Sequence, residues 1–174
     1  MSDPLGLDRL RAFLQGWPYR AAIVGGLGIV LRVRPRLTRD IDLVVEVPGD
    51  RTVLLDHLRR AGYGYEEADI DEWLAGGLVR AQARYALLDL IIADDAFLQE
   101  VVQRAEPLIV EGHELPVATV EDLLLMKLEA GRPQDLDDAL AIKDALAKQL
   151  DEAYLDRAGA RIGVDAVAFL RSDR

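Results

Sequence analysis

Apolar and polar residues recur along the first two thirds of the chain in periods that predict alternating helices and strands. Leu7, Leu10 and Leu14 are three and four residues apart, so residues 7–15 are expected to form a short amphipathic helix. Runs rich in apolar and β-branched residues, bounded by Gly or Pro, predict strands. Such runs span residues 19–26 and 40–47, and residues 78–94 hold either two strands or one long bent strand. Helical patterns lie between and after them, at residues 27–33, 50–62 and 95–106.

The last third of the chain predicts a hairpin followed by helices alone. A small hairpin is expected in residues 107–119, turning at Glu111-Gly112, and helices are expected at residues 119–131 and 134–150. The tail from residue 151 predicts one or two more helices. Mixed strands and helices followed by helices alone are typical of an α/β or α+β fold. We expect a mixed β-sheet flanked by helices in residues 1–118 and a helical part in residues 119–174, packed together as a single compact unit.

Composition narrows the class of protein. The chain has 174 residues, of which 51% are hydrophobic, and is long enough for one domain with a substantial core. The absence of cysteine excludes a disulfide framework and thiolate zinc sites. No stretch reaches the ~18 apolar residues of a membrane span, and the first residues lack the apolar core of a signal peptide. We therefore expect no membrane association and a cytoplasmic location.

The charge distribution is uneven. A formal net charge of -10 disfavours general binding to DNA or RNA. Four arginines nevertheless crowd into a short stretch: Arg32, Arg34, Arg36 and Arg39. A local basic spot on an acidic protein favours a small polyanion, such as a nucleoside triphosphate (NTP), over a long duplex.

Asp40 and Asp42 carry the clearest chemical signal. They stand two residues apart in a predicted strand and therefore point to the same face. Asp89 interrupts a second run that is otherwise apolar. Three carboxylates on neighbouring strands would form a hard-oxygen site for one or two Mg²⁺ ions, or Mn²⁺. The structural alternative is that Asp40 and Asp42 lie at an exposed strand end and pair with Arg36 and Arg39, and that Asp89 is an ordinary strand-end acid.

Gly25, Gly26 and Gly28 form a turn between a predicted strand and a predicted helix. Glycines at such a junction let the backbone approach phosphate, and the helix N-terminus supplies N–H groups. A dinucleotide-binding pattern fails because the third glycine is missing, and a Walker A pattern fails because no Gly-Lys-Ser/Thr follows. On the glycines alone, a purely structural turn is the better interpretation.

The longer segment VGGLGIVLRVRPRLTRDIDLVV, residues 24–45, resembles the signature of the nucleotidyltransferase fold shared with DNA polymerase beta: a Gly-Gly or Gly-Ser turn, a helix and then Asp-x-Asp. Its R-x-T-x-D-I-D-L wording resembles the AbiEii-type branch, whose members are often toxins of toxin–antitoxin and abortive-infection systems. TVEDLLLMKLEAGRPQDLDDALAI, residues 119–142, is similar to the helical segment of that branch, where a Lys, an Arg and a following Asp recur. The resemblance covers roughly residues 20–145.

This resemblance implies a minimal nucleotidyltransferase fold and assigns roles to particular residues. The implied set is Gly25, Gly26, Arg39 and Lys127 for the nucleotide, and Asp40, Asp42 and Asp89 for catalysis and the metal ions. Asp89 would be the third carboxylate, which activates or orients the acceptor hydroxyl. Because the second turn residue is Gly26 rather than Ser, a hydroxyl that commonly helps to bind phosphate is missing.

Lys127 stands among apolar neighbours and needs either a partner, such as a phosphate or a site acid, or a route for its charge to water. Arg132 and Asp135 are expected to pair at a helix junction as a structural contact. Asp138 is expected at the surface.

From these patterns we expect a metal-dependent enzyme that transfers a nucleoside monophosphate (NMP) from an NTP to a hydroxyl. The acceptor is left open between an RNA end such as that of tRNA, a protein and a small molecule. A cognate antitoxin or toxin protein is the expected partner. Two alternatives stay open: a non-catalytic binding partner built on the same fold, and a hydrolase that uses the same carboxylates on a phosphoester.

Overall fold

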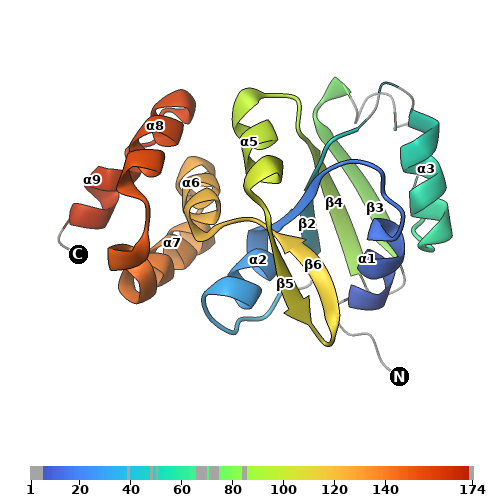
Figure 1. Ribbon diagram of the computed structural model, residues 1–174, viewed down its shortest axis with the longest axis horizontal. Coiled ribbons are helices and arrows are strands. Elements are labelled where there is room, and N and C mark those ends of the chain that lie inside the picture. Colours follow the sequence, from blue (N-terminus) through green and yellow to red (C-terminus); the bar gives the residue numbers. More distant parts are fainter. Residues whose placement is uncertain are drawn as a thin grey trace.

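The computed structural model describes residues 6–38, 40–47, 49, 51–65, 70, 75–83 and 86–172. Within them, six strands form one mixed sheet in the order β3–β4–β2–β1–β6–β5 (Figure 1). The strands are β1 Ala21–Val24, β2 Asp40–Val45, β3 Leu78–Ala83, β4 Ala86–Ile92, β5 Glu106–Val110 and β6 His113–Val117. Strand β2 runs antiparallel to β1 and parallel to β4. The expected α/β fold is confirmed, and residues 78–94 hold two strands rather than one.

Helices cover both faces of the sheet. They are α1 Leu7–Leu14, α2 Gly25–Arg32, α3 Arg51–Arg60, α5 Ala96–Arg104, α6 Val120–Ala130, α7 Pro133–Leu146, α8 Glu152–Ile162 and α9 Ala166–Arg171. In Figure 1, α1 and α3 lie on one side of the sheet and α5 to α9 on the other, with α8 and α9 at the end of the molecule farthest from α3. In the described part of the chain, every helix is too short or not apolar enough to cross a lipid bilayer.

Two apolar cores result from the alternation of side chains along the strands. Ile41 and Leu43 of β2 are buried against α1 and α3, beside Phe13 and Leu58. Val44 faces the other way, into a second core formed with α5, α6 and α8. Each large apolar side chain that is fully buried stabilises the fold by ~1.5–3 kcal/mol. Because Asp40 and Asp42 alternate with Ile41 and Leu43, they belong to the face of the second core.

Side-chain caps fix where several helices begin. Asp95, Asp151 and Asp165 each accept a hydrogen bond from the backbone N–H three residues later, at the start of α5, α8 and α9. Thr119 caps α6 in the same way and accepts from the N–H of Asp122. Such caps typically contribute ~1 kcal/mol each. The predicted helix starts at residues 95 and 119 are confirmed within one residue.

The hairpin predicted at Glu111-Gly112 is also confirmed, between β5 and β6. Both residues have positive φ, 50° and 78°, as a two-residue hairpin turn requires. Before β3, Gly64 forms a single isolated bridge with Gln82.

The helical part of the chain is joined to the sheet by close packing and by a buried polar cluster. At Gly28 of α2 a Cβ would lie 2.7 Å from the side chain of Leu123, so the absence of a side chain there lets α2 and α6 approach. Asp122 of α6, fully buried, accepts hydrogen bonds from Thr119 and from Tyr154 of α8. The guanidinium of Arg104 in α5 lies 3.6 Å from the centre of the Tyr154 ring.

One core therefore spans both sides of the boundary expected after residue 118. The second core combines Ala22 and Val24 of the sheet with Leu123 of α6 and Leu155 of α8. A division into residues 1–118 and 119–174 stays a prediction, but the contacts across it are those of a shared interior.

Gly159 in α8 tests how tightly the helical part is packed. A Cβ there would overlap the carbonyl oxygen of Val164 and lie 3.3 Å from Leu125. Alanine is favoured over glycine in helices by about 1 kcal/mol. We nevertheless expect Gly159→Ala to lower the free energy of unfolding by ~1–3 kcal/mol, because a backbone oxygen cannot move aside as a side chain can. Urea denaturation measures this, and Ala160→Gly at the exposed neighbour isolates helix propensity. A stabilised Gly159→Ala would show that the turn after α8 relaxes freely.

Candidate functional site

The strand register brings the predicted acids together. In the parallel pair of β2 and β4, Asp42 lies directly opposite Asp89 and Asp40 lies opposite Leu87. Residues opposite each other on paired strands share a face, as do residues two apart along one strand. Asp40, Asp42 and Asp89 therefore lie on one face of the sheet. Their catalytic and metal-binding roles stay predictions, and the register gives the three acids the shared face that these roles require.

Asp42 is held at the N-terminus of α2, which has no side-chain cap of its own. The N–H of Gly26 donates to the Asp42 carboxylate. At Gly25 the backbone has φ 57°, and a Cβ would overlap the same carboxylate. Glycine is thus required at position 25 for two reasons, conformation and space. The turn that sequence reasoning assigned to phosphate also supports Asp42.

Burial raises the pKa of Asp42, and the charge of Asp89 raises it further. The charge of Lys127 and the Gly26 N–H act in the opposite direction without cancelling the effect. Desolvation and a like charge thus both oppose ionisation of Asp42. A cation bound beside it would relieve both.

The place of the hydroxyl that Gly26 lacks is filled by other residues. A Cβ at position 26 would lie 2.7 Å from the Thr38 hydroxyl oxygen and 2.8 Å from the guanidinium of Arg36. A serine would not fit there without moving both groups. Thr38 and Arg36 thus put a hydroxyl and a positive charge at the turn from the loop between α2 and β2.

Asp89 has a partner that the sequence did not suggest. Arg80 on the neighbouring strand β3 lies opposite Asp89 and binds it through two hydrogen bonds, Nε to Oδ1 at 2.7 Å and Nη2 to Oδ2 at 2.9 Å. Such two-point pairs are among the stronger charged contacts. The Arg80 side chain is 59% exposed, so solvent weakens this one.

Lys127 of α6 is buried, 7% exposed, and is paired with two acids of α7. Its Nζ lies 2.6 Å from Asp135 and 3.2 Å from Asp138. The expectation that Asp138 lies at the surface is wrong, because its side chain is 1% exposed. Arg36 reaches Asp138 at 2.6 Å from the loop before β2, and this contact keeps the carboxylate in the interior.

The predicted pair of Arg132 and Asp135 is confirmed at 2.5 Å. Burial alone would raise the pKa of Asp135, but hydrogen bonds from Arg132 and Lys127 outweigh burial and lower it. In this cluster two carboxylates meet the cations of Lys127, Arg36 and Arg132. Positive charge therefore exceeds negative charge on the side of the site that faces Asp42.

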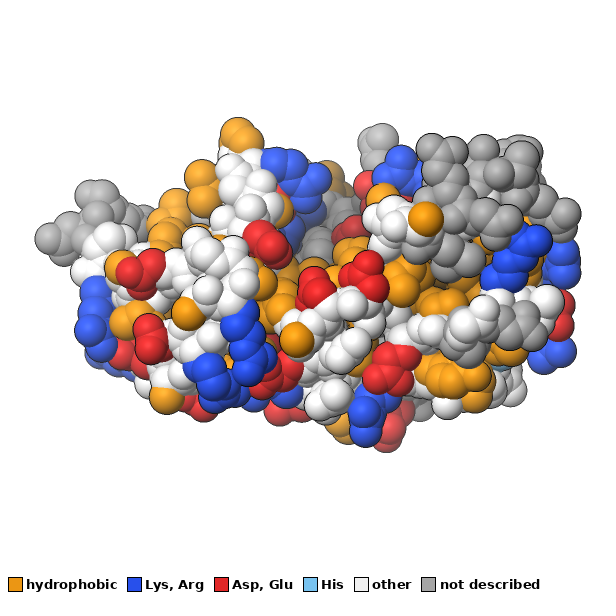
Figure 2. Space-filling view, turned by 90° about the horizontal axis from the view of Figure 1, so that it is seen from above, with side chains coloured by type: hydrophobic (Ala, Val, Ile, Leu, Met, Phe, Trp, Pro, Cys, Tyr) orange, Lys and Arg blue, Asp and Glu red, His pale blue; other side chains and the backbone are white. Residues whose placement is uncertain are grey.

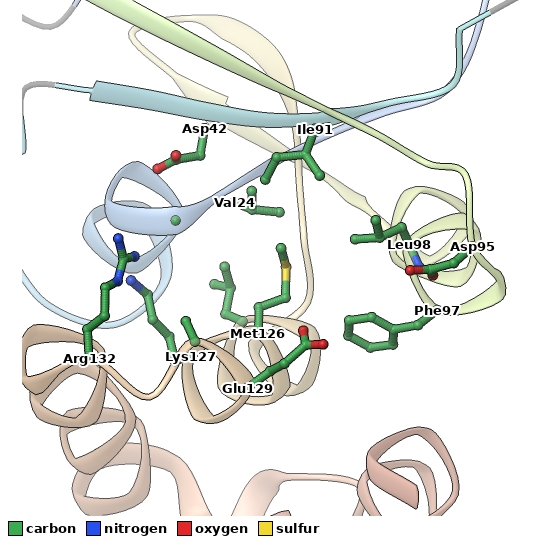
Figure 3. A pocket seen from close by; sticks show the side chains of 13 residues that line it. Val24, Asp42, Ile91, Asp95, Phe97, Leu98, Met126, Lys127, Glu129 and Arg132 are labelled. Atoms are coloured by element: carbon green, nitrogen blue, oxygen red, sulfur yellow. The ribbon is translucent and has the colours of Figure 1, made fainter. Parts of the chain in front are cut away.

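Two cavities meet beside Asp42. The larger, the polar cavity, has a volume of about 840 Å³, and its charged lining residues are Arg36, Asp40, Asp42, Arg80, Asp89, Lys127 and Arg132. The smaller, the apolar pocket, has a volume of about 380 Å³ and lies between the sheet, α5 and α6 (Figure 3). Asp42, Lys127 and Arg132 line both cavities.

A family comparison settles which proteins this chain resembles. The model of the AbiEii family, described as nucleotidyl transferase AbiEii toxin of type IV toxin–antitoxin systems, matches residues 9–161. The chain belongs to the AbiEii nucleotidyltransferase family. No curated protein is significantly similar to it in sequence.

Solved structures support the same fold for this AbiEii family member. The antibiotic-resistance factor ANT(2'')-Ia is 18% identical, with a TM-score of 0.60 over 95% of this chain and 94% of its own. The lincosamide antibiotic adenylyltransferase LnuA, bound to lincomycin, is 18% identical, with a TM-score of 0.57 over 79% of this chain and 94% of its own. A nucleotidyltransferase-like antigen from Paracoccidioides brasiliensis is 18% identical, with a TM-score of 0.51 over 82% and 77%. At these identities the likeness concerns the fold.

The carboxylates of the AbiEii chain fit a divalent ion in donor type, because oxygen is what Mg²⁺ and Mn²⁺ prefer. Among the described residues, no three acidic or histidine side chains already converge on a point where an ion could sit. Asp89 is turned to Arg80 instead. Arg39, predicted to bind the nucleotide, lies outside the described residues.

Sequence reasoning missed Arg80, Thr38 and the inward position of Asp138. Arg80 could have been found from the alternation in residues 78–83, had the register of β3 against β4 been known. Thr38 is part of the R-x-T-x-D-I-D-L motif by which the chain resembles the AbiEii branch, but the motif alone assigned it no role in the site.

Asp42 yields a prediction about stability. Its pKa in the fold lies above the ordinary value of 3.8. At pH values below 3.8 the Asp42 carboxyl is protonated in both the folded and the unfolded chain and does not change the free energy of unfolding. At pH values above the raised pKa it is ionised in both, and the ionised form destabilises the metal-free fold. The free energy of unfolding therefore falls as the pH rises from 3.8 through the raised pKa. We expect Asp42→Asn to be more stable than the wild type at pH 7 in EDTA, whereas an average substitution costs about 1 kcal/mol.

Urea unfolding at several pH values measures the difference, which should shrink towards acid pH. Asp156→Asn, at an exposed position of α8, serves as the control and should show no such trend. An Asp42→Asn variant that is less stable at pH 7 would mean that the hydrogen bond from Gly26 outweighs burial and repulsion.

Proposed function

We propose that this AbiEii nucleotidyltransferase is a metal-dependent enzyme that transfers NMP from an NTP to a hydroxyl acceptor and releases pyrophosphate. The observation that carries the proposal is the register of Asp42 against Asp89 at the edge of a cavity lined by Arg36, Lys127 and Arg132. Acids for a metal ion and cations for a polyphosphate are the two requirements of this reaction, which depends mainly on positioning and charge neutralisation.

Different residues of the site would bind the triphosphate and the metal ion. Lys127, Arg132 and Arg36 would bind the triphosphate in the polar cavity, assisted by the Thr38 hydroxyl and the Gly25-Gly26 turn. Asp40, Asp42 and Asp89 would hold Mg²⁺ or Mn²⁺. The bound ion would neutralise charge on the phosphates and lower the pKa of the acceptor hydroxyl.

The reaction forms a bond between the acceptor oxygen and the α-phosphorus and breaks the bond from that phosphorus to the pyrophosphate oxygen. Asp89, farther from the glycine turn than Asp42, would orient the acceptor hydroxyl and take up its proton. For this Arg80 has to release at least one carboxylate oxygen of Asp89. Arg80 lines the same cavity and would then be free to contact the phosphates.

The acceptor is a small molecule, a protein or an RNA end, and charge favours the first two. The net charge is -10, and on the face seen in Figure 2 acidic and basic side chains are interspersed rather than separated. Nucleic acid binding at physiological salt needs a concentration of positive charge. LnuA is an adenylyltransferase of lincosamide antibiotics, and one ANT(2'')-Ia structure contains adenylyl-2''-tobramycin, so small-molecule acceptors are compatible with this fold. Incubating the protein with labelled NTPs and cell lysate, then locating the label, would identify the class.

The family description supports a toxin role with a cognate antitoxin as partner. A second function stays open, that of a scaffold with the same fold that binds without catalysis. Calorimetric titration with Mg²⁺ and each NTP separates the two, because a scaffold without activity should bind no NTP in a metal-dependent way. A hydrolase using the same acids would instead release NMP with no acceptor present.

Substitution of the paired acids tests the proposal directly. We expect Asp42→Asn and Asp89→Asn each to lower the rate of NMP transfer by about 10²–10³-fold or more, because each removes one charge from the proposed ion site. The rate is measured as pyrophosphate release with Mg²⁺. Circular dichroism verifies folding, and Asp156→Asn is the matched control. Full activity of either site variant would remove that acid from the mechanism.

Arg80 provides a test that does not depend on activity. If it competes with a cation for Asp89, Arg80→Gln should bind Mn²⁺ about three- to tenfold more tightly, a modest gain because the pair is partly exposed. Free Mn²⁺ is followed by electron paramagnetic resonance. Arg161→Gln breaks a comparable pair with Glu100, far from the site, and should leave binding unchanged. Weaker Mn²⁺ binding by Arg80→Gln would mean that Arg80 orients Asp89 for the ion.

A further inference from the structure

The apolar pocket beside Asp42 has no role in the reaction as described so far. Its middle is formed by Val24 of β1, Ile91 of β4, Phe97 of α5 and Met126 of α6. Figure 3 shows these side chains directed towards one another from the sheet above and the helices below. A concave, mostly apolar cavity that adjoins reactive groups is the usual form of a binding site for an organic group.

The two ends of the apolar pocket carry opposite charges. Lys127 and Arg132 lie at the end next to Asp42, and Asp95 and Glu129 lie at the other end (Figure 3). A ligand that matches this order has an anionic end at the reactive site, an apolar middle and hydrogen-bond donors at its far end.

The position of the apolar pocket relative to the polar cavity determines which part of the substrates it can hold. In an NTP the α-phosphorus links the nucleoside to the pyrophosphate, so these two parts extend from it in different directions. The polar cavity and the apolar pocket meet at Asp42, Lys127 and Arg132, where the α-phosphate would lie. Asp89, which would orient the acceptor, lines the polar cavity and not the apolar pocket. Because the attacking and leaving oxygens lie roughly in line, the acceptor must lie opposite the pyrophosphate. Both fit in the polar cavity, with the acceptor beside Asp89 and the pyrophosphate beside Arg36. The apolar pocket is then left for the nucleoside.

We propose that the apolar pocket holds the nucleoside of the NTP and that Glu129 selects bases whose edge donates hydrogen bonds. This inference rests on the proposed function. A carboxylate only accepts hydrogen bonds. Adenine and cytosine offer it an amino group, and guanine offers a ring N–H beside an amino group. Uracil presents one N–H between two carbonyl oxygens, which a carboxylate repels.

Glu129 is an exposed residue at the edge of the apolar pocket. It stands in the last turn of α6, where the helix dipole disfavours a negative charge. Burial raises the pKa of its carboxyl, and the charge of Asp95 raises it further. Among the described residues, none forms an ion pair or a side-chain hydrogen bond with Glu129, whereas Asp95 caps α5 by accepting from the Leu98 N–H at 2.7 Å. Glu129 is thus the acid at this end that is free to accept from a ligand.

Calorimetric titration with the α,β-methylene analogues of ATP, CTP, GTP and UTP in Mg²⁺ tests the proposal, since these analogues are not turned over by cleavage at the α-phosphorus. We expect the wild type to bind the first three at least about tenfold more tightly than the uracil analogue, the usual worth of a hydrogen bond to a charged group. Glu129→Gln, which can also donate, should reduce this difference to about threefold or less. Glu152→Gln, an exposed helical position outside both cavities, should behave as the wild type.

A second variant tests the place of the nucleoside. Ala130 lines the apolar pocket at an exposed position of α6, so Ala130→Leu should fill space without disturbing the core. We expect it to weaken all four analogues at least about tenfold and to leave binding of inorganic tripolyphosphate with Mg²⁺ unchanged.

The outcomes separate this inference from the function on which it rests. Analogues that bind without base preference, or an unchanged preference in Glu129→Gln, would overturn the role of Glu129. Unchanged binding by Ala130→Leu would overturn the nucleoside assignment and leave the pocket to the acceptor. If neither the analogues nor tripolyphosphate bind with Mg²⁺, the proposed function itself fails.

Discussion

The facing pair of Asp42 and Asp89 is the constraint around which the rest of the site is built. Two carboxylates in register on neighbouring strands repel each other, and burial of Asp42 adds to the cost. Nearby groups offset part of this cost. The Gly26 N–H and the charge of Lys127 stabilise the Asp42 carboxylate, and Arg80 stabilises Asp89 through two hydrogen bonds. None of these replaces a cation between the acids. A cation bound between the two acids would relieve this repulsion.

A second set of charges explains why the helical part and the nucleotidyltransferase sheet form one structure. Lys127 of α6 reaches Asp138 of α7, and Asp138 in turn holds Arg36 from the loop that precedes the acids. This chain of contacts crosses the boundary expected after residue 118. Removing Asp138 would leave the largely buried Arg36 without its carboxylate partner and Lys127 with Asp135 alone, which is costly in a protein interior. The positive side of the site is thus assembled from distant segments and depends on their correct packing.

The fold was largely predictable because its strands and helices follow local rules. The spacing of Asp40 and Asp42 fixes a shared face whatever the sheet looks like, and Thr119 marks a helix start by its own chemistry. The partners of charged residues were not predictable in this way. Whether Arg80 meets Asp89 depends on the register between two strands, and whether Asp138 is exposed depends on an arginine 102 residues away. A polar residue in an amphipathic helix looks like a surface residue until a partner brought by tertiary structure buries it.

The arrangement of the two cavities separates chemistry from recognition. The groups proposed to act on phosphate come from β2, β4, the turn at Gly25, the loop before β2, α6 and the start of α7, and several of them are joined by ion pairs. The middle of the apolar pocket is formed by side chains such as Phe97 and Met126, which contribute shape rather than charge. A change there alters volume without disturbing the charge balance, whereas a change at Lys127 alters both. This separation gives a physical reason why the bound organic group can change while the acids and cations stay in place.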